Sequence, residues 1–446
     1  MTVASTLAAS APSHAGAAPT HEAQKEPLYV WLFLAGLVFT MFSGNTGLMG
    51  LPLSPDRPLF AFAILLLILD PNRDRLRWRW FYAIAALLVL WTAFSWFATG
   101  SFTDGLKAFA LLDRIIVPLA MFPLGALIFA TDHRRELLLR TVALMAIYVG
   151  FIGFFEYIRV GALVFPSYIM ENLNPSTDIR SGGPWLFPEP LGLVCALAIF
   201  LSGLLVRTTA TRLWRVVGML GIFFGFVGSV VCMVRSVWLA LIVAGLVVGL
   251  IVPRIRRRLP LMLIAAAIAA AIIVFVFPDF RDVLINRITT ERSVYDRQNT
   301  NVAALRVIEQ FPIFGIGWGE FVHQNVLWVR QADTYPVTTV TIEIHNVFLS
   351  RAAETGIPGL LLWLLCFVTG PLLGLLSKPL TASARYWKLA ALAAFFIWFI
   401  PSLSSPNPYP TPNNLVWLVW GIAARGILVE LPARPADLPL RATLPA

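Results

Sequence analysis

Residues 80–98 of the chain read WFYAIAALLVLWTAFSWFA, a run of 19 residues without a charged side chain. A helix rises about 1.5 Å per residue, so this run can cross the hydrocarbon core of a bilayer, which is about 30 Å thick. Apolar runs of this kind recur from Leu28 to Leu428, and 58% of the 446 residues are hydrophobic whereas only 13% are charged. The sequence therefore predicts an all-α polytopic membrane protein. It excludes soluble enzymes and nucleic-acid-binding proteins, because so few charges cannot solvate several polar domain surfaces.

Spans are predicted where about 17–25 residues are mostly apolar, and shorter ones are allowed where neighbouring helices cover them. We predict twelve transmembrane helices, at residues 28–42, 58–70, 80–98, 106–130, 137–159, 190–206, 213–233, 236–252, 259–277, 345–377, 389–402 and 415–429. The chain then divides into a disordered cytoplasmic tail at 1–27, helices one to nine within 28–277, a large extracytoplasmic loop at 278–344, helices ten to twelve within 345–429, and a cytoplasmic tail at 430–446.

Basic residues on alternate connections set the predicted orientation. They lie between spans two and three and after spans four, six, eight and ten, as Arg73, Arg75, Arg77, Arg79, Arg134, Arg135, Arg207, Arg212, Arg215, Arg254, Arg256, Arg257, Arg258, Lys378, Arg385 and Lys388. All five clusters fall on one side if the N-terminus is cytoplasmic, as the positive-inside rule requires. Both termini are therefore expected in the cytoplasm, and the net charge of +10 does not require a nucleic-acid partner.

Four segments on the opposite side carry the chemistry-bearing residues. The first is RSGGPWLFPEP at 180–190, and the second is Arg235-Ser236 at the junction of spans seven and eight. The third is Arg297 followed by the turn PIFGIGWG at 312–319, and the fourth is EIHN at 343–346, which continues to AETGIPG at 353–359. The loop that contains the last two is far longer than a simple connector, and such loops usually have a function.

Together these segments resemble the superfamily of O-antigen ligases and Wzy-type polysaccharide polymerases, over residues 60–430 or so. The most specific part is the His345-Asn346 pair with the Gly-x-x-Gly of Gly356 and Gly359 downstream, at the start of a membrane helix. The turn at 312–319 is similar to the family's PLFGVGPG-like segment. Arg235 matches the family's SRG-like motif only in part, because the order here is Val-Arg-Ser-Val.

The resemblance implies a glycosyltransferase of the bacterial inner membrane with its active site on the extracytoplasmic side. Such an enzyme takes a glycan from a polyprenyl-pyrophosphate donor, of the undecaprenyl pyrophosphate type, and passes it to a hydroxyl acceptor. Its products are surface polysaccharides such as lipopolysaccharide or exopolysaccharide. Expected partners are the lipid-linked donor, a glycan or lipid-linked acceptor, the bilayer and other polysaccharide-assembly proteins.

The resemblance also suggests roles for individual residues. The planar fork of Arg grips phosphate oxygens in a bidentate way and stays charged, so Arg180, Arg235 and Arg297 are candidate pyrophosphate ligands. Each has a simpler alternative, which is a carboxylate partner, snorkelling to the interface or a solvated loop position. Among the glycines and polar caps, the loop-shaping residues are expected to be Gly315, Gly317, Gly319, Asn346, Gly356 and Gly359, because glycine permits turns that other residues resist.

His345 and Glu343 are the candidate catalytic residues. A neutral imidazole can accept the proton of an acceptor hydroxyl while that hydroxyl attacks a sugar carbon. Glu343 could orient the imidazole or share the proton, or it could be a solvated loop carboxylate. No metal or other cofactor is expected, because the pyrophosphate is already an activated leaving group and the histidines form no HExxH pair. The expected reaction is a single displacement that inverts the anomeric carbon.

Two alternatives remain open from the sequence. A polymerase and a ligase need the same donor site and the same base, so they differ only in the acceptor pocket, and we lean slightly to the polymerase. A secondary transporter or a flippase for lipid-linked glycans also fits twelve spans, although such proteins usually show internal repeats or broken helices near the midplane. Asp113 and Arg114 are the main charges inside a predicted span, and they are expected to pair locally. Trp185, Trp318 and Trp328 are expected to pack the outer loops onto the bundle rather than to stack on a sugar.

Overall fold

The computed structural model describes residues 26–100, 105–173, 180–276, 281–282, 285, 289, 292–329, 343–379 and 381–430. Within these residues the chain is helical apart from turns, loops and an isolated bridge between Leu76 and Val429. The helices are α1 (Leu28–Phe39), α2 (Asp56–Leu69), α3 (Trp80–Ala98), α4 (Gly105–Leu111), α5 (Val117–Ile128), α6 (Asp132–Tyr157), α7 (Tyr168–Glu171), α8 (Pro188–Thr208), α9 (Arg212–Val231), α10 (Arg235–Ile251), α11 (Pro253–Val276), α13 (Arg292–Gln310), α14 (Phe321–Trp328), α15 (Val347–Phe367), α16 (Leu373–Leu376), α17 (Ala382–Ser402) and α18 (Pro410–Leu428).

Seven helical stretches in the described part of the chain are long and apolar enough to cross a membrane. They are Trp80–Ala98, Lys107–Ile128, Asp132–Tyr157, Pro188–Thr208, Arg212–Val231, Val347–Leu376 and Ala382–Ser402. Two shorter apolar helices, Leu28–Phe42 and Arg235–Ile251, accompany them. For the described residues, the prediction of an all-α membrane protein with several spans is confirmed. The count of twelve spans stays a prediction.

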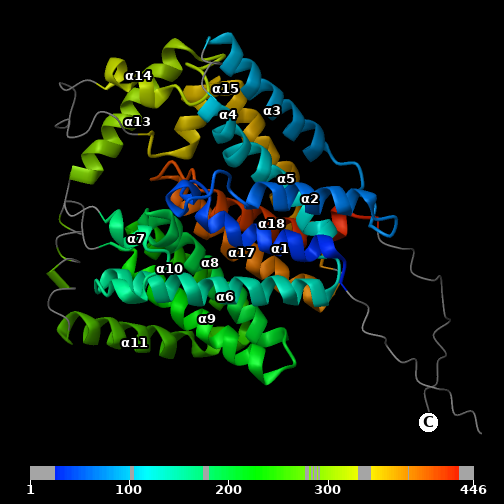
Figure 1. Ribbon diagram of the computed structural model, residues 1–446, viewed down its shortest axis with the longest axis vertical. Coiled ribbons are helices and arrows are strands. Elements are labelled where there is room, and N and C mark those ends of the chain that lie inside the picture. Colours follow the sequence, from blue (N-terminus) through cyan, green and yellow to red (C-terminus); the bar gives the residue numbers. More distant parts are fainter. Residues whose placement is uncertain are drawn as a thin grey trace, which may run out of the picture.

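The helices form one bundle with α18 at its centre (Figure 1). Most side chains of α18 are buried, because α5 and α17 pack on either side of it. The approach to α5 is close enough that a Cβ on Gly421 would overlap the carbonyl of Phe122, which is typical of small residues at membrane helix contacts. Figure 1 shows α13 and α14 beside α15 and α4, away from α6, α9 and α11.

One end of the bundle brings together both ends of the described chain. Glu26 pairs with Arg134 at 2.6 Å, and Asp74 pairs with Arg425 at 2.7 Å. The amide of Glu430 donates to the carbonyl of Arg75 at 2.9 Å. This end, which we call the basic end, therefore includes the connections at 70–79 and 129–135 and both ends of the described chain.

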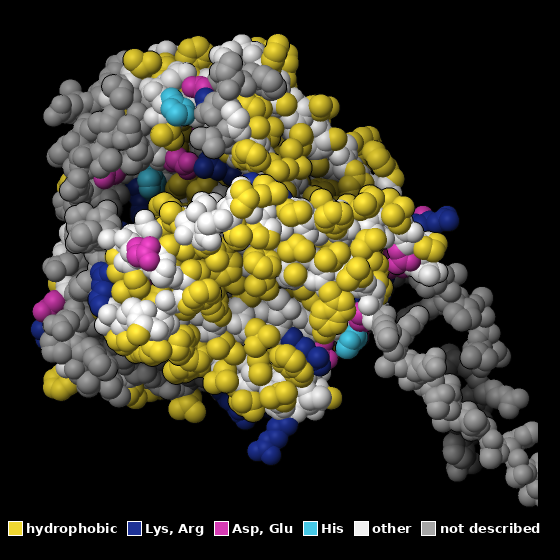
Figure 2. Space-filling view, viewed as in Figure 1, with side chains coloured by type: hydrophobic (Ala, Val, Ile, Leu, Met, Phe, Trp, Pro, Cys, Tyr) yellow, Lys and Arg dark blue, Asp and Glu magenta, His cyan; other side chains and the backbone are white. Residues whose placement is uncertain are grey.

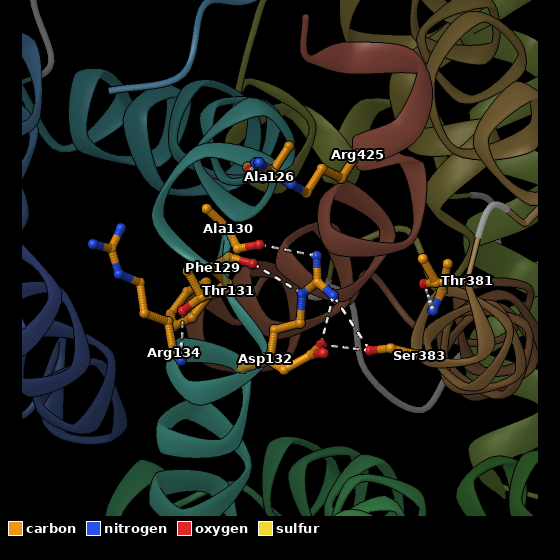
Figure 3. A network of polar contacts seen from close by, with 11 residues as sticks. Ala126, Phe129, Ala130, Thr131, Asp132, Arg134, Thr381, Ser383 and Arg425 are labelled. Atoms are coloured by element: carbon orange, nitrogen blue, oxygen red, sulfur yellow. Dashed lines mark hydrogen bonds and ion pairs between the residues drawn. The ribbon is translucent and has the colours of Figure 1, made fainter. Parts of the chain in front are cut away.

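Arg135 ties the start of α6 to α17 at the basic end. Its guanidinium donates to the Phe129 and Ala130 carbonyls and reaches Asp132 at 3.0 Å and Ser383 at 3.3 Å. Figure 3 shows Asp132 and Ser383 turned toward each other beside these two carbonyls. The guanidinium of Arg207 lies over the ring of Tyr386, 5.1 Å from its centroid. Four of the five predicted basic clusters thus share one end of the molecule, and the predicted orientation of the connections stays a prediction.

Candidate functional site

At the end of the bundle opposite the basic end, the turn at 312–319 packs against α15 where that helix is interrupted. Gly356 has φ 74° and ψ 175°, so the helix is interrupted there. The freed backbone groups pair with the turn: the amides of Ile316 and Gly317 donate to the carbonyls of Ala353 and Glu354, at 3.0 and 3.1 Å. The amide of Ile357 donates to the carbonyl of Pro312 at 2.8 Å. The third and fourth sequence segments are therefore joined by main-chain hydrogen bonds.

The turn depends on glycine at its alternate positions. Gly315, Gly317 and Gly319 have φ of 67°, 104° and 71°, in the left-handed region that other residues rarely adopt. Gly315 also packs so closely that a Cβ would come within 2.5 Å of the Ala353 carbonyl. These glycines thus have the geometry expected of loop-shaping residues.

Trp318 anchors the turn in the bundle. Its side chain is 1% exposed, and its indole N–H donates to the carbonyl of Lys107 at 3.1 Å. The guanidinium of Arg351 lies 4.8 Å from the ring centroid, and Lys107 forms a buried ion pair with Glu320. Trp185 is likewise buried and bonded to Thr411. Trp318 and Trp185 therefore pack their loops onto the bundle, as expected, whereas Trp328 is only partly buried.

His345 lies immediately before α15. Asn346 caps this helix, because its side-chain oxygen accepts from the amides of Phe348 and Leu349 at 2.9 and 3.2 Å. The Nδ1 of His345 lies 2.8 Å from the carbonyl oxygen of Glu343. A carbonyl only accepts, so this contact assigns the proton to Nδ1 and leaves the lone pair on Nε2.

The electrostatic surroundings favour a neutral imidazole. Burial lowers the pKa of His345, and the positive charge of Arg297 lowers it further. The carbonyl and the charge of Glu343 act in the opposite direction, but the net shift is downward. His345 is therefore an unprotonated imidazole near pH 7, with Nε2 able to accept a proton.

Glu343 is held by an arginine from a distant helix. Its Oε1 lies 2.8 Å from Nη2 of Arg114, while Asp113 pairs with Arg57 at 2.9 Å. The prediction that Asp113 and Arg114 pair with each other is wrong. Consecutive residues on a helix point in different directions, so each of the two reaches a different neighbour. The carboxylate of Glu343 thus binds Arg114, and its backbone carbonyl binds His345.

Two further charged residues interact with the ion pair of Arg114 and Glu343, and the sequence did not assign them a role. Arg351 and Glu354 are 6% and 5% exposed on α15, and both interact electrostatically with Arg114 and Glu343. A cavity of about 20 Å³ beside Arg114 and Arg351 has room for about one water. The signal that could have found them is the presence of two ionisable residues inside a predicted span.

The structure brings two of the three candidate pyrophosphate ligands toward one region. Arg297, on α13, lies close enough to His345 and Glu189 to lower the pKa of the imidazole and to interact with the carboxyl group. Arg180 lies just before the short helical turn Gly183–Trp185 and interacts electrostatically with Tyr409. Arg235 is the first residue of α10, three residues after Cys232, which in turn interacts with Glu189 and Arg180.

Glu189 and Tyr409 are members of this region that the sequence did not identify. The carboxylate of Glu189, at the start of α8, accepts a hydrogen bond from the hydroxyl of Ser405. Burial raises the pKa of Tyr409, so its phenol stays protonated. Figure 2 shows a hollow below α13 in which basic, acidic and histidine side chains gather. In the described residues, no group of three or more His, Cys, Asp or Glu side chains is arranged to hold a metal ion.

Residues 220–364 match the family model described as O-antigen ligase. Over this stretch the chain is similar to O-antigen ligases. The matched stretch runs from within α9 into α15, so it contains Arg235, Arg297, the turn at 312–319 and His345. Arg180, in the loop before the turn Gly183–Trp185, and Arg114 lie outside the matched stretch. The predicted resemblance to the superfamily is confirmed over these residues, and it supports a role in polysaccharide assembly. No curated protein matches the chain.

Proposed function

We propose that the protein is a membrane glycosyltransferase that moves a glycan from a polyprenyl-pyrophosphate donor to a hydroxyl acceptor. The observation that carries the proposal is the state of His345: its Nδ1 is bound to the Glu343 carbonyl at 2.8 Å, and its pKa is lowered beside Arg297. An unprotonated base next to a fixed cation suits a reaction that takes a proton from one group and releases an anion from another. The site lies at the end of the bundle opposite the basic end. We assign the end that contains the site to the extracytoplasmic side of the inner membrane.

The proposed reaction is one displacement. The acceptor oxygen attacks the anomeric carbon and its proton passes to Nε2 of His345. The bond from the anomeric carbon to the pyrophosphate oxygen breaks, and its electron pair leaves with the pyrophosphate. Arg297, with Arg180 and Arg235, would stabilise the negative charge that develops there, because fixed cations act strongly where water is scarce. Attack from the face opposite the leaving group inverts the anomeric carbon, and the step needs no metal.

Glu343 enters this proposal as a positioning residue. We expect Glu343→Gln to keep the transfer rate within about tenfold of the parent, because the contact with His345 comes from the backbone carbonyl rather than from the carboxylate. The measurement is the turnover number in reconstituted vesicles. The matched comparison is Arg114→Gln, which breaks the same ion pair from the other side. A loss of a thousandfold in Glu343→Gln alone would instead make its carboxylate the base.

The pH dependence of transfer tests the state of His345. The imidazole acts when it is unprotonated, so activity is expected to fall as the pH drops through its lowered pKa, below the ordinary value of about 6.5. Arg297 is one cause of the lowering, so Arg297→Gln is expected to move this acid limb to higher pH. The measurement is the pH profile of the transfer rate at saturating donor. An acid limb that stays in place in Arg297→Gln would contradict the electrostatic coupling.

One assay separates this function from its alternatives. Purified protein in vesicles is supplied with a polyprenyl-pyrophosphate-linked glycan and an acceptor, and the products are resolved by mass. Transfer supports the enzyme, whereas movement of intact donor across the bilayer without transfer supports a flippase or transporter. A second lipid-linked repeat unit and a lipid A-core acceptor, offered separately, distinguish polymerase from ligase. Transfer that persists with a metal chelator supports the metal-independent mechanism.

A further inference from the structure

Three cavities open at the basic end of the bundle, far from His345. The first, of about 720 Å³, lies between α1, α2 and the start of α6. The second, of about 460 Å³, lies between α6, the end of α8 and α17. The third, of about 390 Å³, is formed by the start of α6, the connection from α16 to α17, and the end of α18. We call the third one the α16–α18 cavity.

The α16–α18 cavity differs from the other two in its charge. The first cavity has three basic and three acidic residues in its lining, namely Arg73, Arg134, Arg425, Glu26, Asp70 and Asp74. The second is also balanced, by Arg135 and Arg207 against Asp132 and Glu136. The α16–α18 cavity has four basic residues and one acidic residue, namely Arg135, Lys378, Lys388, Arg425 and Asp132. It is therefore the one of these three that should attract an anion.

The partners of these cations leave much of the charge uncompensated. Lys388 donates to the carbonyls of Leu375 and Ser377 and to the Ser377 hydroxyl, all of which are uncharged groups. Lys378 is exposed at the cavity. Arg425 is paired, but its partner Asp74 lies outside the lining. An ammonium group bound only by neutral oxygens keeps its full charge for an incoming anion.

Apolar side chains form part of the cavity wall. Trp387, Ile422 and Ala423 line it from the buried core, and Trp387 belongs to α17, a helix long and apolar enough to span a membrane. Figure 3 shows three of the polar lining residues, Asp132, Thr381 and Arg425. A ligand with a phosphate head and apolar chains would match both features. A basic cavity between helices at a membrane surface is a general recognition site for such headgroups.

We propose that the α16–α18 cavity binds the phosphate headgroup of an anionic phospholipid. The phosphate contacts the exposed Lys378, the charge of Lys388 attracts it from the cavity wall, and the acyl chains follow the side of α17 into the membrane. The proposal is independent of glycan transfer, because none of the lining residues belongs to the candidate catalytic site.

The test uses the full-length protein in nanodiscs and measures the dissociation constant of dioleoyl phosphatidylglycerol against a phosphatidylcholine background. Lys378→Glu is expected to weaken binding about tenfold, since each basic residue at a membrane surface contributes about a fivefold effect and the reversal also adds repulsion. The matched control is Arg212→Glu, which makes the same charge reversal at an exposed position on the first residue of α9, outside all three cavities.

Three results decide the outcome. A tenfold loss in Lys378→Glu with less than a twofold loss in Arg212→Glu supports the site. Equal losses of lipid affinity in the two variants would mean that the overall positive charge of the basic end attracts the lipid, and they would overturn the proposal. Inorganic phosphate that competes with the lipid at equal concentration would also overturn it, because the cavity would then bind a free anion rather than a lipid.

Discussion

Replacing His345 by alanine is expected to lower the turnover number for glycan transfer by about 10²–10⁴-fold, the usual contribution of a positioned general base. The reason is local: the variant removes Nε2, the nitrogen that the Glu343 carbonyl leaves free to accept a proton. Donor binding should change little, because the proposed pyrophosphate ligands Arg180, Arg235 and Arg297 remain. The measurement is turnover at saturating donor and acceptor, together with the apparent affinity for the donor.

The chain offers a matched control in His323. This residue lies on α14, in the segment that precedes His345, and its side chain is exposed. His323→Ala should therefore transfer glycan at the parental rate. Both variants must reach the membrane in equal amounts and unfold at the parental temperature for the comparison to hold. A His345→Ala protein that meets these conditions and still turns over at the parental rate would exclude His345 as the base.

The helices were predictable because their signal is local. The predicted span at 80–98 coincides with α3, since its apolar run ends where the helix ends. The run at 389–402 missed the first turns of α17, which begins at Ala382. These turns are polar, and they are fixed by the Thr381 side chain, which accepts from the amide of Ala384. Hydropathy detects the part of a helix that meets lipid and overlooks a polar end that is held by a cap.

The site was predictable only as separate segments. The motifs at 312–319 and 343–359 were identified, but their main-chain pairing across the Gly356 break was not, because hydropathy and motif spacing carry no information on which turn meets which helix. The partner of Glu343 lies 229 residues away, at Arg114. Arg114 was visible as an intramembrane charge, yet a single sequence gives no means of choosing its partner. The structure supplies these long-range pairings, and they change the expected role of Glu343.

Replacing Gly356 by alanine is expected to destabilise the protein by about 3–5 kcal/mol and to reduce transfer by more than a hundredfold. A Cβ at this position would overlap the Ile313 carbonyl, and φ of 74° costs a non-glycine residue about 1–3 kcal/mol. Relief requires the turn to move away from α15, which breaks hydrogen bonds of about 0.5–1.5 kcal/mol each. The turn follows α13, which carries Arg297, and packs against α15, which begins just after His345. If the turn moved away from α15, Arg297 and His345 would lose their relative position.

The measurement combines the midpoint of denaturant-induced unfolding in micelles with limited proteolysis of the outer loop. Gly245→Ala is the matched control, because Gly245 lies within α10 and a Cβ there meets nothing within 4 Å. That variant should be neutral or more stable by up to about 1 kcal/mol, since alanine favours a helix over glycine. If Gly356→Ala unfolded at the parental midpoint and kept the outer loop protected from protease, the break in α15 would not be what holds the turn. The relative position of Arg297 and His345 would then depend on the buried contacts of Trp318 and Lys107 instead.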